Sequence, residues 1–192
     1  LNSEAAFSSG LGISNDDKFK VAQWRDQHLP LAFKAIPAEN FHITLVFLGL
    51  IDNSQQTDIT QSINQQRDSI RTLLAPVLQA HKTLSIGLSE IGYFKAAKVL
   101  HVMPSVCPEW LIRLNTTIVA SCRESAIAIE NRAYQPHLSL YRKAKFDSSE
   151  ALSTRQKNTI VQNICINSFS LYHSYSTDFG VVYQAVKTWK IN

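Results

Sequence analysis

Apolar and polar residues alternate along this chain at two different spacings, which predicts a mixture of helices and strands. A first helix is expected after Ser14 or Asn15 and runs to about Gln27, with an inner stripe formed by Val21, Trp24 and His28. A longer helix is expected from about Ser54 to Gln79, because apolar residues recur there at helical spacing: Ile59, Ile63, Ile70, Leu74, Val77 and Leu78.

A third helix is expected to open at Pro108 and to carry on one side Leu111, Leu114, Ile118 and Cys122. Strands are expected at about 41–48, 84–90, 98–103, 137–142, 164–173 and 181–188. Helices and strands therefore intermix within a single domain, 1–192, which predicts an α+β fold. Each half of the chain holds helices and strands, which suggests two similar lobes. Each lobe would be a small antiparallel sheet backed by helices, and the two would meet at a central cleft.

The tetrad His-apolar-Ser/Thr-Leu occurs at 42–45 and again at 137–140, half a chain apart. In an extended strand, residues two apart face the same side. Each tetrad therefore presents an imidazole and a hydroxyl together, while its two apolar residues anchor the strand on the other side: His42 with Thr44, and His137 with Ser139. Two such strands facing each other would form a site with two histidines and two hydroxyls.

A third match to this pattern, at 81–84, differs from the other two in its context. The run 41–48 is apolar on both faces except for His42 and Thr44, as in a strand that is buried on both sides. The match that begins at His81 carries Lys82 on its anchoring face and directly follows a helical stretch. We therefore exclude His81 from the candidate site. Three other histidines lack the tetrad and are interpreted as structural or, at the helix end, as surface residues: His101, His173 and His28.

Composition and charge set broad limits on the class of protein. With 45% hydrophobic and 18% charged residues, the 192-residue chain is typical of a globular protein. Its apolar runs are too short for a membrane helix, and its first residues do not resemble a signal peptide, so we expect a cytoplasmic protein. The three cysteines are widely spaced, which favours a reducing compartment over a disulfide framework or a zinc site. The net charge of +4 modestly favours anionic partners.

Two imidazoles suit the cleavage or formation of a phosphodiester without a metal. One can remove a proton from the attacking oxygen while the other gives a proton to the leaving oxygen, because an ordinary histidine pKa near 6.5 allows either role. The hydroxyls of Thr44 and Ser139 can donate hydrogen bonds to non-bridging phosphate oxygens. From the residues alone, it stays open which histidine is the acid and which is the base.

The tetrads allow two other interpretations. Each histidine could be a core residue with satisfied hydrogen bonds, but two copies on buried strands half a chain apart make this interpretation less favourable. The histidines could also bind a metal, yet no Asp, Glu or Cys lies at ligand spacing from either of them. We therefore expect neither a metal nor another cofactor.

The segments around both tetrads resemble the 2H phosphoesterases, and among them the bacterial RNA 2′,3′-cyclic phosphodiesterases, also called 2′-5′ RNA ligases. The segment 40–49 is similar to that group's N-L-H-x-T-L-x-F-L-G, and 136–142 is similar to its P-H-x-T-L-x-R. The likeness extends over almost the whole chain, through Trp24-Arg25, 98–100 and the closing residues Gly180, Tyr183 and Trp189. It departs in three places: the polar, glycine-containing segment 7–12 where a Phe-rich strand is usual, Ser139 for Thr and Lys98 for Arg.

The resemblance implies a bilobal fold with pseudo-twofold symmetry and a reaction without metal. A 2′,3′-cyclic phosphate at an RNA end would be hydrolysed to a 2′-phosphate, with His42 as proton donor to the 3′ oxygen and His137 as proton acceptor from water. The same chemistry with a ribose 5′-hydroxyl in place of water would be RNA ligation. Three alternatives remain: a 2H enzyme acting on small cyclic nucleotides, one acting on 2′-5′ oligonucleotides, and an RNA-end-binding protein without turnover.

Further substrate-binding candidates are Arg142, Lys98, Phe94 and Tyr141. Strict alternation along the strand places Arg142 on the face opposite His137, unless a bulge intervenes. Lys98 stands near the start of a strand and could face the cleft. The rings of Phe94 and Tyr141, and of Tyr93, could stack on bases, although aromatic residues in strands more often belong to the core. The expected partner is RNA with a cyclic phosphate end, bound by a monomer away from membranes.

Overall fold

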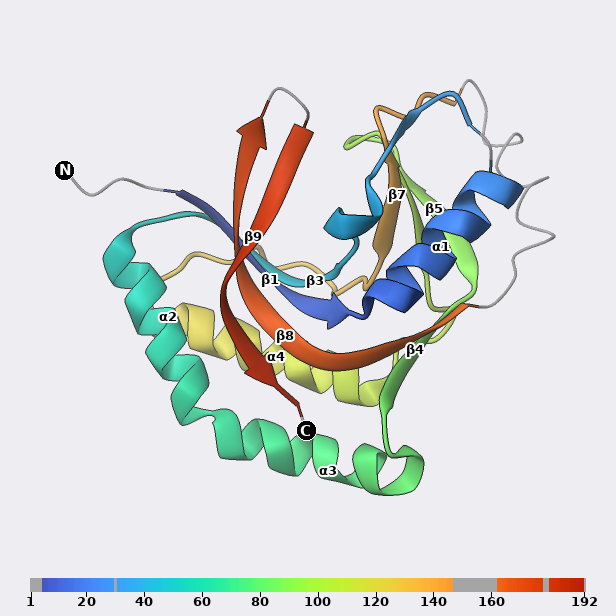
Figure 1. Ribbon diagram of the computed structural model, residues 1–192. Coiled ribbons are helices and arrows are strands. Elements are labelled where there is room, and N and C mark those ends of the chain that lie inside the picture. The colour runs from blue at the N-terminus through green and yellow to red at the C-terminus, as the bar shows by residue number, and fades with distance from the viewer. Residues whose placement is uncertain (1–4, 30, 147–161, 178–179, 192) are drawn as a thin grey trace.

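A single antiparallel sheet runs through the molecule, as the computed structural model in Figure 1 shows. The structure describes residues 5–29, 31–146, 162–177 and 180–191. The path of neighbouring strands is β4-β8-β1-β3-β7-β6-β5, with β2 paired to β7 and β9 to β8. The strands are β1 (Ala5–Ile13), β2 (Lys34–Ala35), β3 (Ile43–Ile51), β4 (Leu84–Leu88), β5 (Glu90–Phe94), β6 (Val99–Met103), β7 (Leu138–Arg142), β8 (Gln162–Thr177) and β9 (Gly180–Lys190).

In the described part of the chain, four α-helices and a short 3₁₀ turn pack on this sheet, which confirms the α+β class. They are α1 (Asn15–His28), η1 (Ala38–Asn40), α2 (Asn53–Gln65), α3 (Arg67–His81) and α4 (Glu109–Glu124). Helices α2 and α3 both pack against α4, and α4 packs against β3. Helix α1 packs on η1 and β8, and Figure 1 shows it apart from the other three helices. No helix among the described residues is long and apolar enough to span a membrane.

The first and third helices begin close to the predicted residues. Ser14 caps α1, because its side chain accepts a hydrogen bond from the Asp17 backbone N–H at 3.1 Å. Within this helix Val21 and Trp24 are buried as predicted, whereas His28 is exposed at the helix end. Pro108, the predicted first residue, is the N-cap of α4, so the helix begins at Glu109, one residue later than predicted.

The single helix predicted over 54–79 is wrong, because the chain forms two helices that meet at Gln66. Gln66 has a φ of −81° and a ψ of 0°, so the backbone bends without leaving the right-handed region. Ile63 and Ile70 are buried on either side of this bend. The apolar spacing therefore continues across the junction, and periodicity alone could not reveal it.

Three strands differ from the prediction. The segment 7–12, which lacks the expected Phe-rich pattern, lies within β1, between β3 and β8. Ser8 and Ser9 are buried there, so small polar residues occupy the middle of an interior strand. Strands β2 and β5 were not predicted as separate elements, since β2 has only two residues and β5 follows β4 after a single residue.

The sheet has two parts, and they join at one residue pair. Strands β4, β8, β1 and β3 form one part, and β7, β6 and β5 form the other. Between β3 and β7 only Ile43 and Leu138 pair directly, in antiparallel register. These are the second residues of the two tetrads, so the junction of the sheet is also where the tetrads meet. The pseudo-twofold relation between two lobes stays a prediction.

Candidate active site

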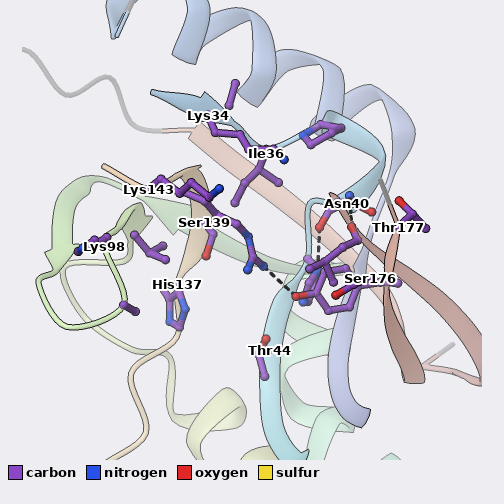
Figure 2. Close-up of a pocket in the computed structure, with 18 residues that line it drawn as sticks. Lys34, Ile36, Asn40, Thr44, Lys98, His137, Ser139, Lys143, Ser176 and Thr177 are labelled. Carbon is purple, nitrogen blue, oxygen red and sulfur yellow. Dashed lines mark hydrogen bonds between the residues drawn. The ribbon is translucent and has the colours of Figure 1, made fainter. Parts of the chain in front are cut away.

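The register at the sheet junction brings the four tetrad side chains to one pocket. Because Ile43 pairs with Leu138 in antiparallel register, His42 falls opposite Ser139, and Thr44 falls opposite His137. All four side chains line a pocket of about 500 Å³, shown in Figure 2. The structure thus brings together the two tetrads, which lie half a chain apart in the sequence.

Both imidazoles are held in the same way. His42 Nδ1 lies 2.8 Å from the carbonyl oxygen of Asn40, and His137 Nδ1 lies 2.8 Å from that of Gln135. A carbonyl oxygen only accepts a hydrogen bond, so Nδ1 of each ring carries the proton. Nε2 of each ring is then the nitrogen left to exchange a proton with a bound molecule.

A β-bulge follows the hydroxyl residue in each tetrad. The pairing of β1 with β3 goes from Ser9–Val46 to Gly10–Thr44 and so skips Leu45. The pairing of β6 with β7 goes from Leu100–Tyr141 to His101–Ser139 and so skips Leu140. In both strands the extra residue is therefore the final Leu of the tetrad. A bulge reverses the alternation of side chains beyond it.

The bulge at Leu140 corrects the expectation for Arg142. Strict alternation places Arg142 opposite His137, but the structure places both in the pocket lining. Leu140 and Tyr141 are both buried because the alternation is interrupted between them, and Arg142 then returns to the side of Ser139. Arg142 Nη2 donates a hydrogen bond to Tyr183 Oη at 2.9 Å, which links β7 to β9 across the pocket.

Aromatic residues and a glycine surround His42. The ring of Tyr183 lies 4.5 Å from the His42 ring, centroid to centroid, and that of Tyr172 lies at 5.6 Å. On β1, a Cβ built on Gly10 would lie 3.2 Å from His42 Cδ2 and 3.1 Å from the Ile43 carbonyl oxygen. Gly10 therefore leaves the space in which the imidazole lies. Sequence reasoning missed Gly10 and Tyr172, and it noted Tyr183 without assigning it to the site.

The pocket is positively charged. Four cationic side chains from the described residues line it: Lys34, Lys98, Arg142 and Lys143. Among the described residues the lining includes no Asp, Glu or Cys, and these residues hold no group of three or more potential metal ligands anywhere. The lining suits a phosphate, since cationic groups, hydroxyls and imidazoles all bind or protonate phosphate oxygens.

Burial keeps both histidines neutral in the free protein. It lowers the pKa of His42 to about 4, and the charges of Lys18, His137 and Arg142 also lower it, against the raising effect of the hydrogen bond to Asn40. Burial also lowers the pKa of His137, and Arg132 adds to this effect, while the hydrogen bond to Gln135 opposes it. A phosphate anion in the pocket would favour the charged form of either ring.

The aromatic candidates lie outside the described lining of the pocket. Tyr141 is only 3% exposed, and its Oη donates a hydrogen bond to the Leu29 carbonyl oxygen at 2.6 Å, so it is a core residue rather than a stacking surface. Phe94 stacks on His101 at 4.1 Å and meets His137 edge-on at 4.8 Å. Phe94 therefore packs against the ring of a tetrad histidine outside the described pocket lining. Tyr93 Oη donates to the backbone of Ala144.

The remaining histidines also lie outside the described lining of the pocket. His81 is the exposed last residue of α3. His101 is 2% exposed, with its ring 5.2 Å from the His137 ring. His173 stacks on Phe7 at 5.2 Å.

Comparisons with known proteins match nearly the whole chain. Residues 16–185 match the family model described as the AKAP7 2′5′ RNA ligase-like domain. The chain is 24% identical to an RNA 2′,3′-cyclic phosphodiesterase of Methanocaldococcus jannaschii over 188 residues, covering 93% of this chain and 96% of that protein. It is also 24% identical to an Escherichia coli RNA 2′,3′-cyclic phosphodiesterase over 173 residues, covering 90% of this chain and 88% of that protein.

Solved structures share the fold. The structure of E. coli LigT complexed with 3′-AMP superposes with a TM-score of 0.78 at 18% sequence identity, covering 98% of this chain and 99% of that one. TT0787 of Thermus thermophilus superposes with a TM-score of 0.68 at 16% identity, covering 97% of each chain. The large antiparallel sheet and its helices are therefore an arrangement already known from solved structures.

Proposed function

Because the chain belongs to the AKAP7 2′5′ RNA ligase-like domain family of 2H phosphoesterases, we propose that it is an RNA 2′,3′-cyclic phosphodiesterase. It hydrolyses a 2′,3′-cyclic phosphate at an RNA end to a 2′-phosphate, without a metal or other cofactor. The names of its relatives from M. jannaschii and E. coli support this substrate.

The observation that carries the proposal is the matched pair of imidazoles. Both rings line one pocket, and both use Nδ1 to donate to a backbone carbonyl oxygen two residues earlier. Each ring therefore keeps Nε2 for proton transfer. Hydrolysis of a phosphodiester needs one proton removed and one supplied, and a positioned group for each typically contributes about 10² to 10⁴ in rate.

In the proposed reaction, His137 Nε2 takes a proton from water as the water oxygen attacks phosphorus. The bond between phosphorus and the 3′ oxygen breaks, and protonated His42 Nε2 gives its proton to that oxygen. The phosphate stays attached to the 2′ oxygen. The protons balance, since one histidine gains what the water loses and the other loses what the ribose gains. A ribose 5′-hydroxyl in place of water would form a 2′-5′ linkage by the same steps.

The other polar groups of the pocket stabilise the charge on the phosphate. The hydroxyls of Thr44 and Ser139 donate to its non-bridging oxygens, where negative charge grows as water attacks. The hydrogen bond from Arg142 to Tyr183 holds the guanidinium group toward the pocket, where it adds a permanent positive charge. Within this proposal the protein acts as a monomer in the cytoplasm, where RNA is its partner.

The proposal is tested by incubating the purified protein in EDTA with a cyclic-ended RNA oligomer and, separately, with a nucleoside 2′,3′-cyclic phosphate. We expect the oligomer to be opened to a 2′-monophosphate end, identified by chromatography against both monophosphate standards. A 3′-monophosphate as the only product, or a requirement for added divalent metal, would contradict the mechanism.

The alternatives give different results in the same assay. An enzyme for small nucleotides would open the nucleoside cyclic phosphate in preference to the oligomer. An enzyme for 2′-5′ oligonucleotides would leave both substrates intact and cleave a 2′-5′-linked dinucleotide. A binding protein would retain the cyclic-ended oligomer without turning it over.

A further inference from the structure

Three lysines gather at one end of the pocket, beyond the groups used in the proposed reaction. They are Lys34, Lys98 and Lys143, and Figure 2 shows them on one side of the pocket, with Thr44 at the other. All three are exposed, so their ammonium groups are accessible to a ligand. The proposed hydrolysis uses none of them.

The backbone holds these lysines next to one another. Lys34 on β2 is the cross-strand partner of Arg142 on β7, and Lys143 is the next residue along the chain. The backbone N–H of Ala144 donates to the Lys98 carbonyl oxygen at 2.9 Å, which joins the turn before β6 to the end of β7. The three side chains therefore come from three segments fixed to each other by backbone hydrogen bonds.

Lys98 and Lys143 both have an unfavourable backbone conformation. Their φ values are 53° and 55°, in the left-handed region that residues with a side chain rarely occupy. Such strain persists where the surrounding structure fixes it, and it clusters at functional sites. Two other described residues with a side chain, Lys82 and Ala126, share this conformation; they follow α3 and α4 and lie outside the described pocket lining.

The positive charge of the cluster is not neutralised by the described residues. None of the ion pairs found among them involves any of the three lysines, and the described pocket lining contains no carboxylate. Like charges held together repel one another, and an anion between them removes this cost. Arg142 and the tetrads already account for one phosphate, so the lysines can accept a second.

We propose that Lys34, Lys98 and Lys143 form a second phosphate subsite, which binds the phosphate on the 5′ side of the terminal nucleoside. In an RNA this is the next phosphodiester of the chain, so the subsite selects RNA ends over nucleosides that carry only the cyclic phosphate. The pocket of about 500 Å³ is within the usual size range for a ligand larger than one phosphate group. The inference rests on the proposed function and specifies its substrate class.

Binding measurements test the subsite without relying on turnover. The ligands are adenosine 2′-monophosphate, adenosine 2′,5′-bisphosphate and a trinucleotide with a 2′-phosphate end, and affinity is measured by calorimetry. We expect the bisphosphate and the trinucleotide to bind at least about fivefold more tightly than the monophosphate, because both supply the second phosphate. The double variant Lys34→Gln/Lys143→Gln should lose most of this advantage.

The salt dependence gives a second readout. The slope of log affinity against log salt for the trinucleotide should become shallower by about 0.7 for each lysine that no longer contacts a phosphate. The matched control is Lys187→Gln, which removes one charge from an exposed position on β9 outside the described pocket lining. This control should still bind the bisphosphate and the trinucleotide more tightly than the monophosphate, as the wild type does. Thermal melting shows whether each variant is folded.

If the double variant still bound the bisphosphate and the trinucleotide more tightly than the monophosphate by the wild-type factor, the proposal of a subsite would be overturned. An equal loss for the monophosphate would also overturn it, since the lysines would then act on the catalytic phosphate. An advantage confined to the bisphosphate would overturn the choice of RNA as the source of the second phosphate. Failure of the proposed function is distinguishable, because it appears as absent hydrolysis while the binding ratios stand.

Discussion

At the scale of single residues, the environment of His42 decides which protonation state the free protein has. Burial and the positive charges of Lys18, His137 and Arg142 lower its pKa to about 4, so the ring is neutral near pH 7. A proton donor must carry its proton before the reaction. The donor role implied for His42 therefore needs the negative charge of the substrate phosphate, which raises the pKa toward the pH at which the enzyme works.

We therefore predict that substrate-like anions raise the pKa of His42. NMR titration of the free protein should show the His42 ring protonating near pH 4, and the midpoint should move upward when adenosine 2′-monophosphate is bound. The sign follows because the phosphate favours the charged imidazolium, whereas burial favours the neutral ring.

His137 provides an internal comparison in the same titration. Its pKa should also lie below 6.5 in the free protein, in keeping with a neutral ring that accepts a proton from water. A midpoint for His42 at or above 6.5 without ligand, or one that does not rise with ligand, would contradict this account of the donor.

At the scale of elements, the sequence predicts the parts whose apolar spacing is regular and misses those set by tertiary contacts. The cap at Ser14 and the alternation around both tetrads place α1, β3 and β7 close to their observed positions. The bend at Gln66 is invisible because apolar residues continue through it at helical spacing. Strand β1 lacks a regular apolar pattern that would predict it. Its extended conformation is set by pairing with β3 on one side and β8 on the other.

The residues of the candidate site also fall into those that local spacing predicts and those that tertiary contacts determine. The two histidines and two hydroxyls follow from strand alternation, and the structure places all four in one pocket. The side on which Arg142 lies could not be predicted, because it is set by the bulge at Leu140. That bulge depends on the pairing of β7 with β6. Gly10 and Tyr183 come from distant strands, so no local spacing marks them as neighbours of His42.

Gly10 gives a prediction about how β1 positions the imidazole on the neighbouring chain segment. In Gly10→Ala the new methyl group would press on His42 Cδ2, and small displacements of a catalytic group are costly. We expect kcat to fall by about tenfold or more, with KM changed less. Steady-state kinetics on a cyclic-ended RNA measures both.

The neighbouring residue offers a matched control. Ser9→Ala changes a buried side chain of the same strand, and Ser9 pairs with Val46 beyond the bulge rather than with a tetrad residue. It should keep kcat near the wild-type value. If Gly10→Ala keeps full activity, or if its loss only follows a loss of thermal stability, Gly10 does not position His42.

At the scale of the whole molecule, the pocket lined by both tetrads exists only because two distant parts of the chain meet. The pair Ile43–Leu138 joins the two parts of the sheet and sets each histidine opposite the hydroxyl of the other tetrad. Each part contributes one imidazole, one hydroxyl and the bulge that follows that hydroxyl residue. Neither part alone holds both imidazoles, so the proposed reaction requires the assembled fold.

The central claim is that these two tetrads, and not the third match at His81, form one active site. It is tested most directly by the turnover of a cyclic-ended RNA by His42→Ala, His137→Ala and His81→Ala. The account predicts that each of the first two variants loses at least about 10² in kcat. It predicts that His81→Ala keeps nearly full activity. Near-normal turnover by either tetrad variant, or an equal loss in His81→Ala, would contradict it.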